Sequence, residues 1–149
     1  MKHQIKREQW VDRPLDETFN FFKEAKNLEK ITPPYLHFRV LSQSTPNVQE
    51  GTRINYLLFL RGLPMWWQSE IVNWKENQHF MDIQRRGPYK RWEHLHAFKE
   101  KDGGTLVIDE VTFEIYFEKW MINFIRRDVD KIFDYRVKKL DEIFRSQYS

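Results

Sequence analysis

The sequence predicts an α+β fold, in which a curled antiparallel sheet of seven strands packs against one long C-terminal helix. Residues 120–144 carry apolar side chains at helical spacing, with no Gly or Pro between them. Between residues 35 and 117, six β-rich segments are separated by short turns, which is typical of an antiparallel meander. A helix of roughly 37 Å, at about 1.5 Å per residue, needs a large apolar partner, and only these strands are extensive enough to cover it.

The N-terminal part adds one strand and two short helices. His3–Val11 alternates weakly between apolar and polar residues and is expected to form the first strand, which ends before Pro14. Pro14 is suited to the start of a helix, and Leu15, Phe19 and Phe22 lie on one helical face. Asn27–Ile31 is expected to form a second short helix, which ends because two prolines follow almost at once.

The other six strands are bounded by turn residues. They are expected at Tyr35–Leu41, Thr52–Leu60, Met65–Trp74, His79–Arg85, Tyr89–Lys99 and Thr105–Phe117. Asp102–Gly103, between the last two, indicates a hairpin turn. The pattern in Met65–Trp74 does not decide which of its faces points toward the helix.

Composition limits the classes of function. The 149 residues are an ordinary size for one domain, so a single domain is expected over residues 1–149. The chain has no cysteine, which excludes disulfides, thiolate catalysis and cysteine-bound metals. Its net charge of +3 is mixed along the chain and gives little support to a nucleic-acid partner. No apolar run is long enough for a membrane span, and the N-terminus lacks a signal core, so a cytoplasmic protein without an integral membrane part is expected. The oligomeric state stays unknown.

Short motifs spread over nearly the whole chain strengthen the fold prediction. In order, they are Phe19–Phe22, Asn27–Pro34, Gly62–Pro64, Arg86–Tyr89, Trp92–Phe98 and Gly103–Thr105. This ordered set resembles the START-like, or SRPBCC, superfamily, in the ligand-binding branch that includes polyketide cyclases and coenzyme Q-binding proteins. The resemblance implies a helix-grip fold, in which the sheet curls around the C-terminal helix. It implies no single chemistry, because the superfamily includes lipid carriers, receptors, cyclases and chaperone activators.

Two histidines on one strand form the clearest candidate site. On a strand, His94 and His96 point to the same face, and the aromatic side chains of Trp92 and Phe98 flank them there. This face is therefore expected to be turned away from solvent.

The following strand brings a carboxylate to the same face. A two-residue turn at positions 102–103 places Asp109 opposite His96 and Val111 opposite His94, whereas a slip of two places Val111 opposite His96. In both registers Asp109 lies among β-branched residues and needs a polar partner. An Asp–His pair fixes the imidazole tautomer and directs the other ring nitrogen toward a ligand. The alternative is a hydrogen-bonded network that only closes the sheet.

Three other polar features allow more than one interpretation. The two histidines and Asp109 are acceptable ligands for zinc or iron, but no further ligand motif accompanies them, so neither a metal nor another cofactor is predicted. Glu70, Asp82 and Gln84 either line a cavity as acid–base groups or form pairs with Arg or Lys on the outer face. The basic loop at residues 85–92 is either a solvated hairpin or a contact for an anion.

The aromatic content, 16% of the chain, favours a small hydrophobic ligand, such as a lipid, quinone or polyketide-like compound, bound between sheet and helix. The residues expected to line its cavity are Tyr56, Trp67, Trp92, His94, His96, Phe98, Asp109, Val111, Phe113 and Phe124. One alternative is an enzyme of the polyketide cyclase/dehydrase type with His96 and Asp109 as the acid–base pair. Another is an interaction module with a filled core that works through its surface.

Overall fold

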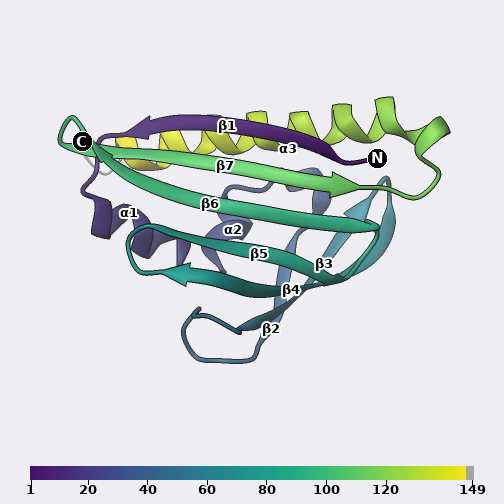
Figure 1. Cartoon of the computed structure of the whole chain (residues 1–149), viewed down its shortest axis with the longest axis horizontal. Helices are drawn as coiled ribbons and strands as arrows, with labels where there is room; N and C mark the ends of the chain where they lie inside the picture. Colours follow the sequence, from purple (N-terminus) through teal and green to yellow (C-terminus); the bar gives the residue numbers. More distant parts are fainter. Residues whose placement is uncertain (147–149) are drawn as a thin grey trace.

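The computed structural model describes residues 1–146 and shows one antiparallel sheet packed against a long helix (Figure 1). The strands are β1 (His3–Val11), β2 (Arg39–Gln43), β3 (Arg53–Leu60), β4 (Leu63–Lys75), β5 (His79–Arg86), β6 (Arg91–Lys101) and β7 (Gly104–Glu114). The helices are α1 (Leu15–Phe22), α2 (Asn27–Lys30), the 3-10 turn η1 (Pro34–Leu36) and α3 (Glu118–Ser146). The strand order is β1-β7-β6-β5-β4-β3-β2, so the meander runs from β2 to β7 and β1 pairs with β7. The predicted α+β fold is confirmed.

Two tight turns set the register of the strands that carry the site. Asp102 and Gly103 have φ values of 50° and 78°, and Arg61 and Gly62 have 51° and 82°. Positive φ at both central residues is the requirement of a type I′ turn, whose twist matches that of paired strands. The predicted hairpin at residues 102–103 is therefore confirmed.

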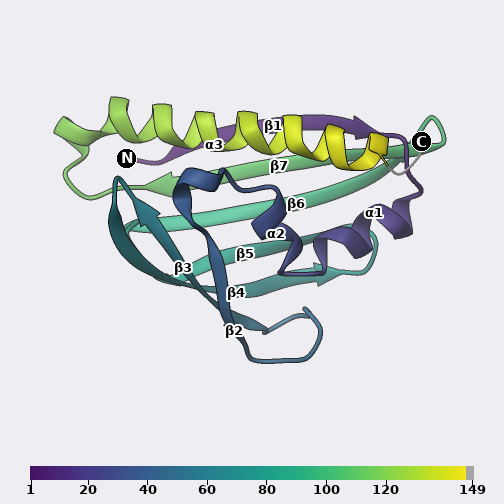
Figure 2. The ribbon, with the colours of Figure 1, turned by 180° about the vertical axis from the view of Figure 1, so that it is seen from behind.

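Helix α3 runs alongside β1 and β7, while α1 and α2 lie over the strands farther along on the same side of the sheet (Figure 2). The buried apolar residues of α3 are Val129, Phe133, Leu140 and Phe144, all within the apolar stripe that the sequence predicted. Arg136 lies on the same stripe and is also buried. No helix within residues 1–146 combines the length and the apolar character needed to cross a membrane.

The strand predicted at Tyr35–Leu41 is wrong in its first half. Pro34 begins the short turn η1, and His37 follows it in the left-handed region with φ of 46°. Extended pairing starts only at Arg39. Proline suits the first position of a helical turn, and the alternation of Leu36 and Phe38 arises because both side chains line one cavity.

The structure also decides the orientation of β4. Ser69 and Ile71 are buried, and Trp67 lines the cavity, so this set of alternate residues faces α3. At the other end of the sheet, β7 ends at Glu114 instead of Phe117. Phe117 has φ of 57°, which is incompatible with an extended strand.

Candidate functional site

A cavity of about 150 Å³ lies between the concave face of the sheet, the α2–η1 segment and α3. Most of its wall is apolar, and its polar groups come mainly from β5, β6 and α3. Its lining residues are Leu28, Ile31, Thr32, Leu36, Phe38, Tyr56, Leu58, Leu60, Trp67, Ser69, Asp82, Tyr89, Trp92, His94, His96, Ile132, Phe133 and Arg136. The core is therefore not continuously filled between sheet and helix.

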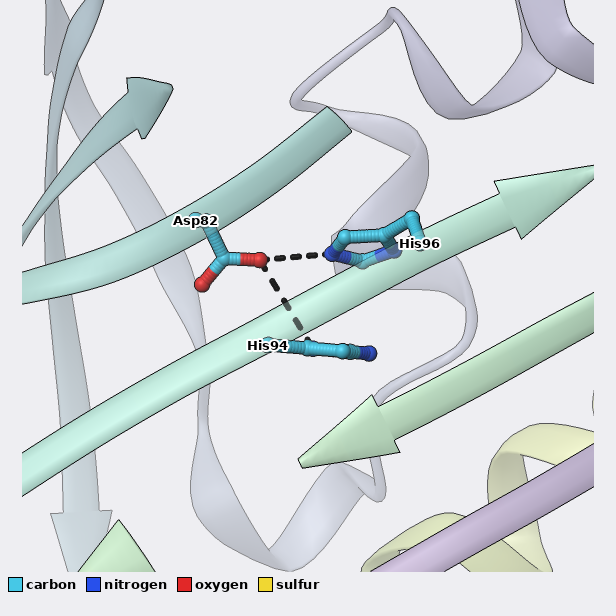
Figure 3. Close-up of side chains that lie close together, drawn as sticks. All are labelled: Asp82, His94 and His96. Atoms are coloured by element: carbon cyan, nitrogen blue, oxygen red, sulfur yellow. Dashed lines mark hydrogen bonds and ion pairs between the residues drawn. The ribbon is translucent and has the colours of Figure 1, made fainter. Parts of the chain in front are cut away.

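Five buried or half-buried polar side chains form a connected cluster at this cavity. His96 Nε2 lies 2.6 Å from Asp82 Oδ2, and His94 Nε2 lies 2.7 Å from Asp109 Oδ1. The two imidazoles stack, with ring centroids 3.7 Å apart, and His94 Nδ1 lies 3.6 Å from Asp82 Oδ2 (Figure 3). Arg136 Nη2 donates to Asp109 Oδ1 at 3.2 Å and contacts His96 Nδ1 at 3.4 Å. The histidines are only 5% and 3% exposed.

The contacts of His96 determine its tautomer. A guanidinium has donors only, so the Nδ1 atom that faces Arg136 must be the unprotonated acceptor. The proton of the neutral ring is then on Nε2, which donates it to the carboxylate of Asp82. Both ring nitrogens of His96 are thus engaged within the cluster.

The electrostatics agree with this assignment. Burial lowers the pKa of His96 to about 4, assisted by the neighbouring His94 and opposed by Asp82. Burial favours a raised pKa for the carboxyl groups of Asp82 and Asp109, but the interactions with their polar partners lower these pKa values by more. The hydrogen bond from His96 lowers the pKa of Asp82, and the charge of Arg136 holds the pKa of Asp109 well below its ordinary value. Both carboxylates are therefore ionised at neutral pH, next to a neutral His96.

The predicted register is present, but the predicted side-chain pair is not the shortest one. Asp109 pairs with His96 along the backbone, and Val111 pairs with His94. Nevertheless the Asp109 carboxylate is 2.7 Å from His94 and 3.7 Å from His96 Nδ1. His96 is turned toward β5, where its ring stacks on Phe80 with centroids 4.5 Å apart. Strand register fixes Cα partners, whereas the rotamers decide which side chains form hydrogen bonds.

The residues expected to line the cavity divide into two groups. Tyr56, Trp67, Trp92, His94 and His96 line it, and Asp109 lies beyond His94. The others lie elsewhere. Phe98 packs in the core near α1, Val111 and Phe113 pack in the core near Val129, and Phe124 lies under the guanidinium of Arg61.

Two members of the cluster come from positions where the sequence left the role open or gave no prediction. Asp82 lines the cavity, whereas Glu70 on β4 forms ion pairs with Arg53 and Arg85 on the other face. Arg136 was not predicted as a site residue. A signal was present, because a charged residue three positions after Phe133 falls within the apolar stripe of α3.

Asp82, His94 and His96 also place three possible metal-ligand atoms within 4.8 Å of one another. An imidazole lone pair lies in the plane of its ring, so two ligating rings must have planes that meet at the ion. Here the rings are stacked at an interplanar angle of 26°. The arrangement therefore fits a hydrogen-bonded network better than a metal centre.

Comparison with solved structures identifies the fold. A START superfamily protein from Mycobacterium smegmatis is 10% identical and superposes with a TM-score of 0.74, covering 97% of this chain and 99% of that one. The protein TTHA0849 from Thermus thermophilus is 20% identical, with a TM-score of 0.73 over 99% of this chain and 100% of that one. The chain has the START-like helix-grip fold. The fold implied by the sequence motifs is therefore confirmed.

A polyketide-pathway protein has the same START-like fold. The di-domain ARO/CYC StfQ from the steffimycin biosynthetic pathway is 11% identical, with a TM-score of 0.77 over 99% of this chain and 52% of that one. No protein-family model matches the sequence, and no curated protein matches it. At these identities the likeness establishes the START-like fold, and the ligand must be argued from the cavity.

Proposed function

We propose that this START-like domain binds a compact, mainly apolar molecule that carries one hydrogen-bond donor, and that Asp82 is its polar anchor. The observation that carries the proposal is an apolar cavity whose one polar end is a connected, ionised cluster. Such a pocket, with few polar groups that fix orientation, is typical of small-molecule sites. START-like folds commonly bind hydrophobic ligands, which supports the same class.

The volume restricts the size of the ligand. A cavity of about 150 Å³ has room for a benzene-sized guest, whereas drug-sized ligands occupy roughly 300 Å³ or more. A single substituted aromatic ring fits this space. The head group of a quinone or one ring of a polyketide therefore suits the cavity better than a lipid chain.

The polarity restricts the functional group. Asp82 Oδ2 accepts the hydrogen bond from His96, while Oδ1 has no hydrogen-bond partner within residues 1–146. The cluster holds two ionised carboxylates and one guanidinium beside the neutral ring of His96. A free carboxylate oxygen favours a hydroxyl or amine donor and disfavours an anionic guest.

Calorimetric titration with 4-ethylphenol and ethylbenzene tests this proposal, because the two probes differ only in the donor. Asp82→Asn is expected to weaken 4-ethylphenol binding about tenfold or more and to leave ethylbenzene unaffected, since a hydrogen bond to a charged group is lost. Glu70→Gln is the matched control, because it neutralises a carboxylate on the outer face of the neighbouring strand. The proposal fails if neither probe binds or if Asp82→Asn binds both probes as tightly as the wild type.

A second candidate is an acid–base enzyme that uses His94. Asp109 orients this ring by its bond to Nε2, and Nδ1 has only a 3.6 Å contact with Asp82 at the cavity wall. Because both nitrogens of His96 are engaged, His94 is the better placed proton carrier. His94→Gln is then expected to abolish turnover of a bound phenol or enol while binding persists. Absence of turnover by the wild type contradicts this candidate and leaves the binding proposal intact.

A further inference from the structure

The connection between β7 and α3 lies at one end of the molecule (Figure 1). Large apolar side chains are exposed there. Tyr116, Phe117, Trp120 and Met121, called here the aromatic face, are exposed by 57%, 73%, 78% and 37%. They border an apolar groove of about 400 Å³ that also includes Pro88. Large apolar side chains gathered on one exposed surface usually mark a contact with a partner or a membrane.

The charges around the aromatic face indicate the chemistry of its partner. Lys119 lies within the segment of the aromatic face, and Arg86 and Lys90 flank Pro88 and Tyr89, which line the groove. Within residues 1–146 the charged groups of these three residues form no ion pair, and the Arg86 guanidinium lies over the ring of Trp66. The backbone N–H of Lys90 donates to the carbonyl of Glu114, which holds the 86–90 loop beside the end of β7.

The acidic residues at this end are outnumbered by free cations. Glu114 pairs with Arg91 and the N-terminal amine, and Asp128 pairs with Arg61, whereas Glu118 is hydrogen-bonded to the ring of His3. This one carboxylate stands against the three cations of Lys90, Lys119 and Arg86. The free charge around the aromatic face is therefore positive. Exposed Trp and Tyr beside free lysines match an interface with anionic head groups, where amphipathic rings and cations are both favoured.

The same surface adjoins the ligand cavity. Leu60 and Tyr89 line the cavity on one side and the apolar groove on the other. These two side chains form a wall that both spaces share. We propose that the aromatic face docks on an anionic lipid bilayer and thereby places the cavity wall against the membrane. The proposal goes beyond ligand binding and does not require it.

Vesicle co-sedimentation tests the docking. Wild-type protein is expected to bind vesicles of phosphatidylcholine mixed with phosphatidylglycerol, to bind pure phosphatidylcholine poorly, and to be released by salt. Trp120→Ser combined with Phe117→Asn is expected to abolish binding, and Asn tolerates the left-handed backbone at that position. Lys90→Gln and Lys119→Gln are each expected to weaken partitioning about fivefold.

Leu41→Ser is the matched control, because Leu41 is 56% exposed on β2 and belongs to neither the groove nor the cavity. It is expected to bind vesicles like the wild type. The double variant is also expected to bind 4-ethylphenol normally in the absence of vesicles, which separates this proposal from the ligand proposal. The docking is overturned if the wild type ignores anionic vesicles or if the double variant still binds them. The docking is equally overturned if the wild type forms a dimer and the double variant is a monomer. In that case a second copy of the chain covers the aromatic face.

Discussion

Lowering the pH from 6.5 to 4 should destabilise the folded protein through His96. The unfolded chain takes up a proton on this residue near pH 6.5, whereas burial lowers the pKa in the folded state to about 4. Across this interval the unfolded state binds more protons, so the free energy of unfolding falls as the pH falls. The interval of 2.5 pH units at about 1.36 kcal/mol each gives a loss of about 3 kcal/mol.

Urea unfolding followed by tryptophan fluorescence, repeated across this pH interval, measures the loss. His96→Gln retains an N–H donor for Asp82 but has no proton to gain, so its stability should change little between pH 6.5 and 4. It should be less stable than the wild type at neutral pH, because the stacking on Phe80 is lost. His37→Asn, at an exposed left-handed position, is the control and should show the wild-type slope.

The measurement must stop near pH 4 for a physical reason. Asp82 and Asp109 have lowered folded-state pKa values, so the stability that they contribute is present above the unfolded pKa and is lost only as the pH falls further. If the wild type and His96→Gln lose the same stability between pH 6.5 and 4, the assignment of a neutral, buried His96 is refuted.

Three other substitutions test the packing around the site by urea unfolding at neutral pH. Arg136→Met leaves two ionised carboxylates without their buried cation and should cost about 3–5 kcal/mol; a cost below about 1 kcal/mol contradicts the cluster. Phe19→Ala removes a fully buried ring in the core and should cost about 3–5 kcal/mol, with an unchanged 4-ethylphenol affinity as the check that the cavity persists. Gly62→Ala should cost only about 1 kcal/mol, because an added Cβ meets no atom within 4 Å and only the positive φ is unfavourable; a larger cost indicates an unrecognised contact.

The architecture and the register of the site strands were predictable because each depends on a local signal. The period of the apolar residues in 120–144 indicates a helix, and the Asp102–Gly103 turn fixes which residues of β6 and β7 are opposite. The inward face of β6 followed from His94 and His96 being flanked by aromatic residues.

The features of the site that the sequence did not predict depend on information that the alternation of apolar and polar residues does not contain. Register shifts occur on β4 at Gln68/Ser69 and again between Val72 and Lys75, and such shifts change which residues of neighbouring strands are opposite. The sequence therefore left open that Glu70 lies outside and Asp82 inside. The hydrogen-bond partner of Asp109 could not be predicted from the sequence either. It depends on side-chain rotamers and on Arg136, which contacts Asp109 only when α3 is packed on the sheet.

Leu60 and Tyr89, the two residues shared by the cavity and the apolar groove, are held in place differently. Tyr89 is held by the rings of Trp67 and Trp92, at centroid distances of 5.5 and 4.8 Å, and its backbone forms two hydrogen bonds with Gln84. Leu60 is the last residue of β3, next to the two-residue turn that begins at Arg61.

That turn is attached to α3 through Arg61. Its guanidinium stacks 3.5 Å from the centroid of the Phe124 ring and pairs with Asp128 at 3.3 Å, and both contacts involve groups that are partly exposed. Exposed ion pairs contribute only about 1 kcal/mol or less, and anionic head groups compete for the same cation. Under the proposed docking, anionic head groups are therefore expected to weaken the attachment of the β3–β4 turn, which begins next to Leu60, to α3.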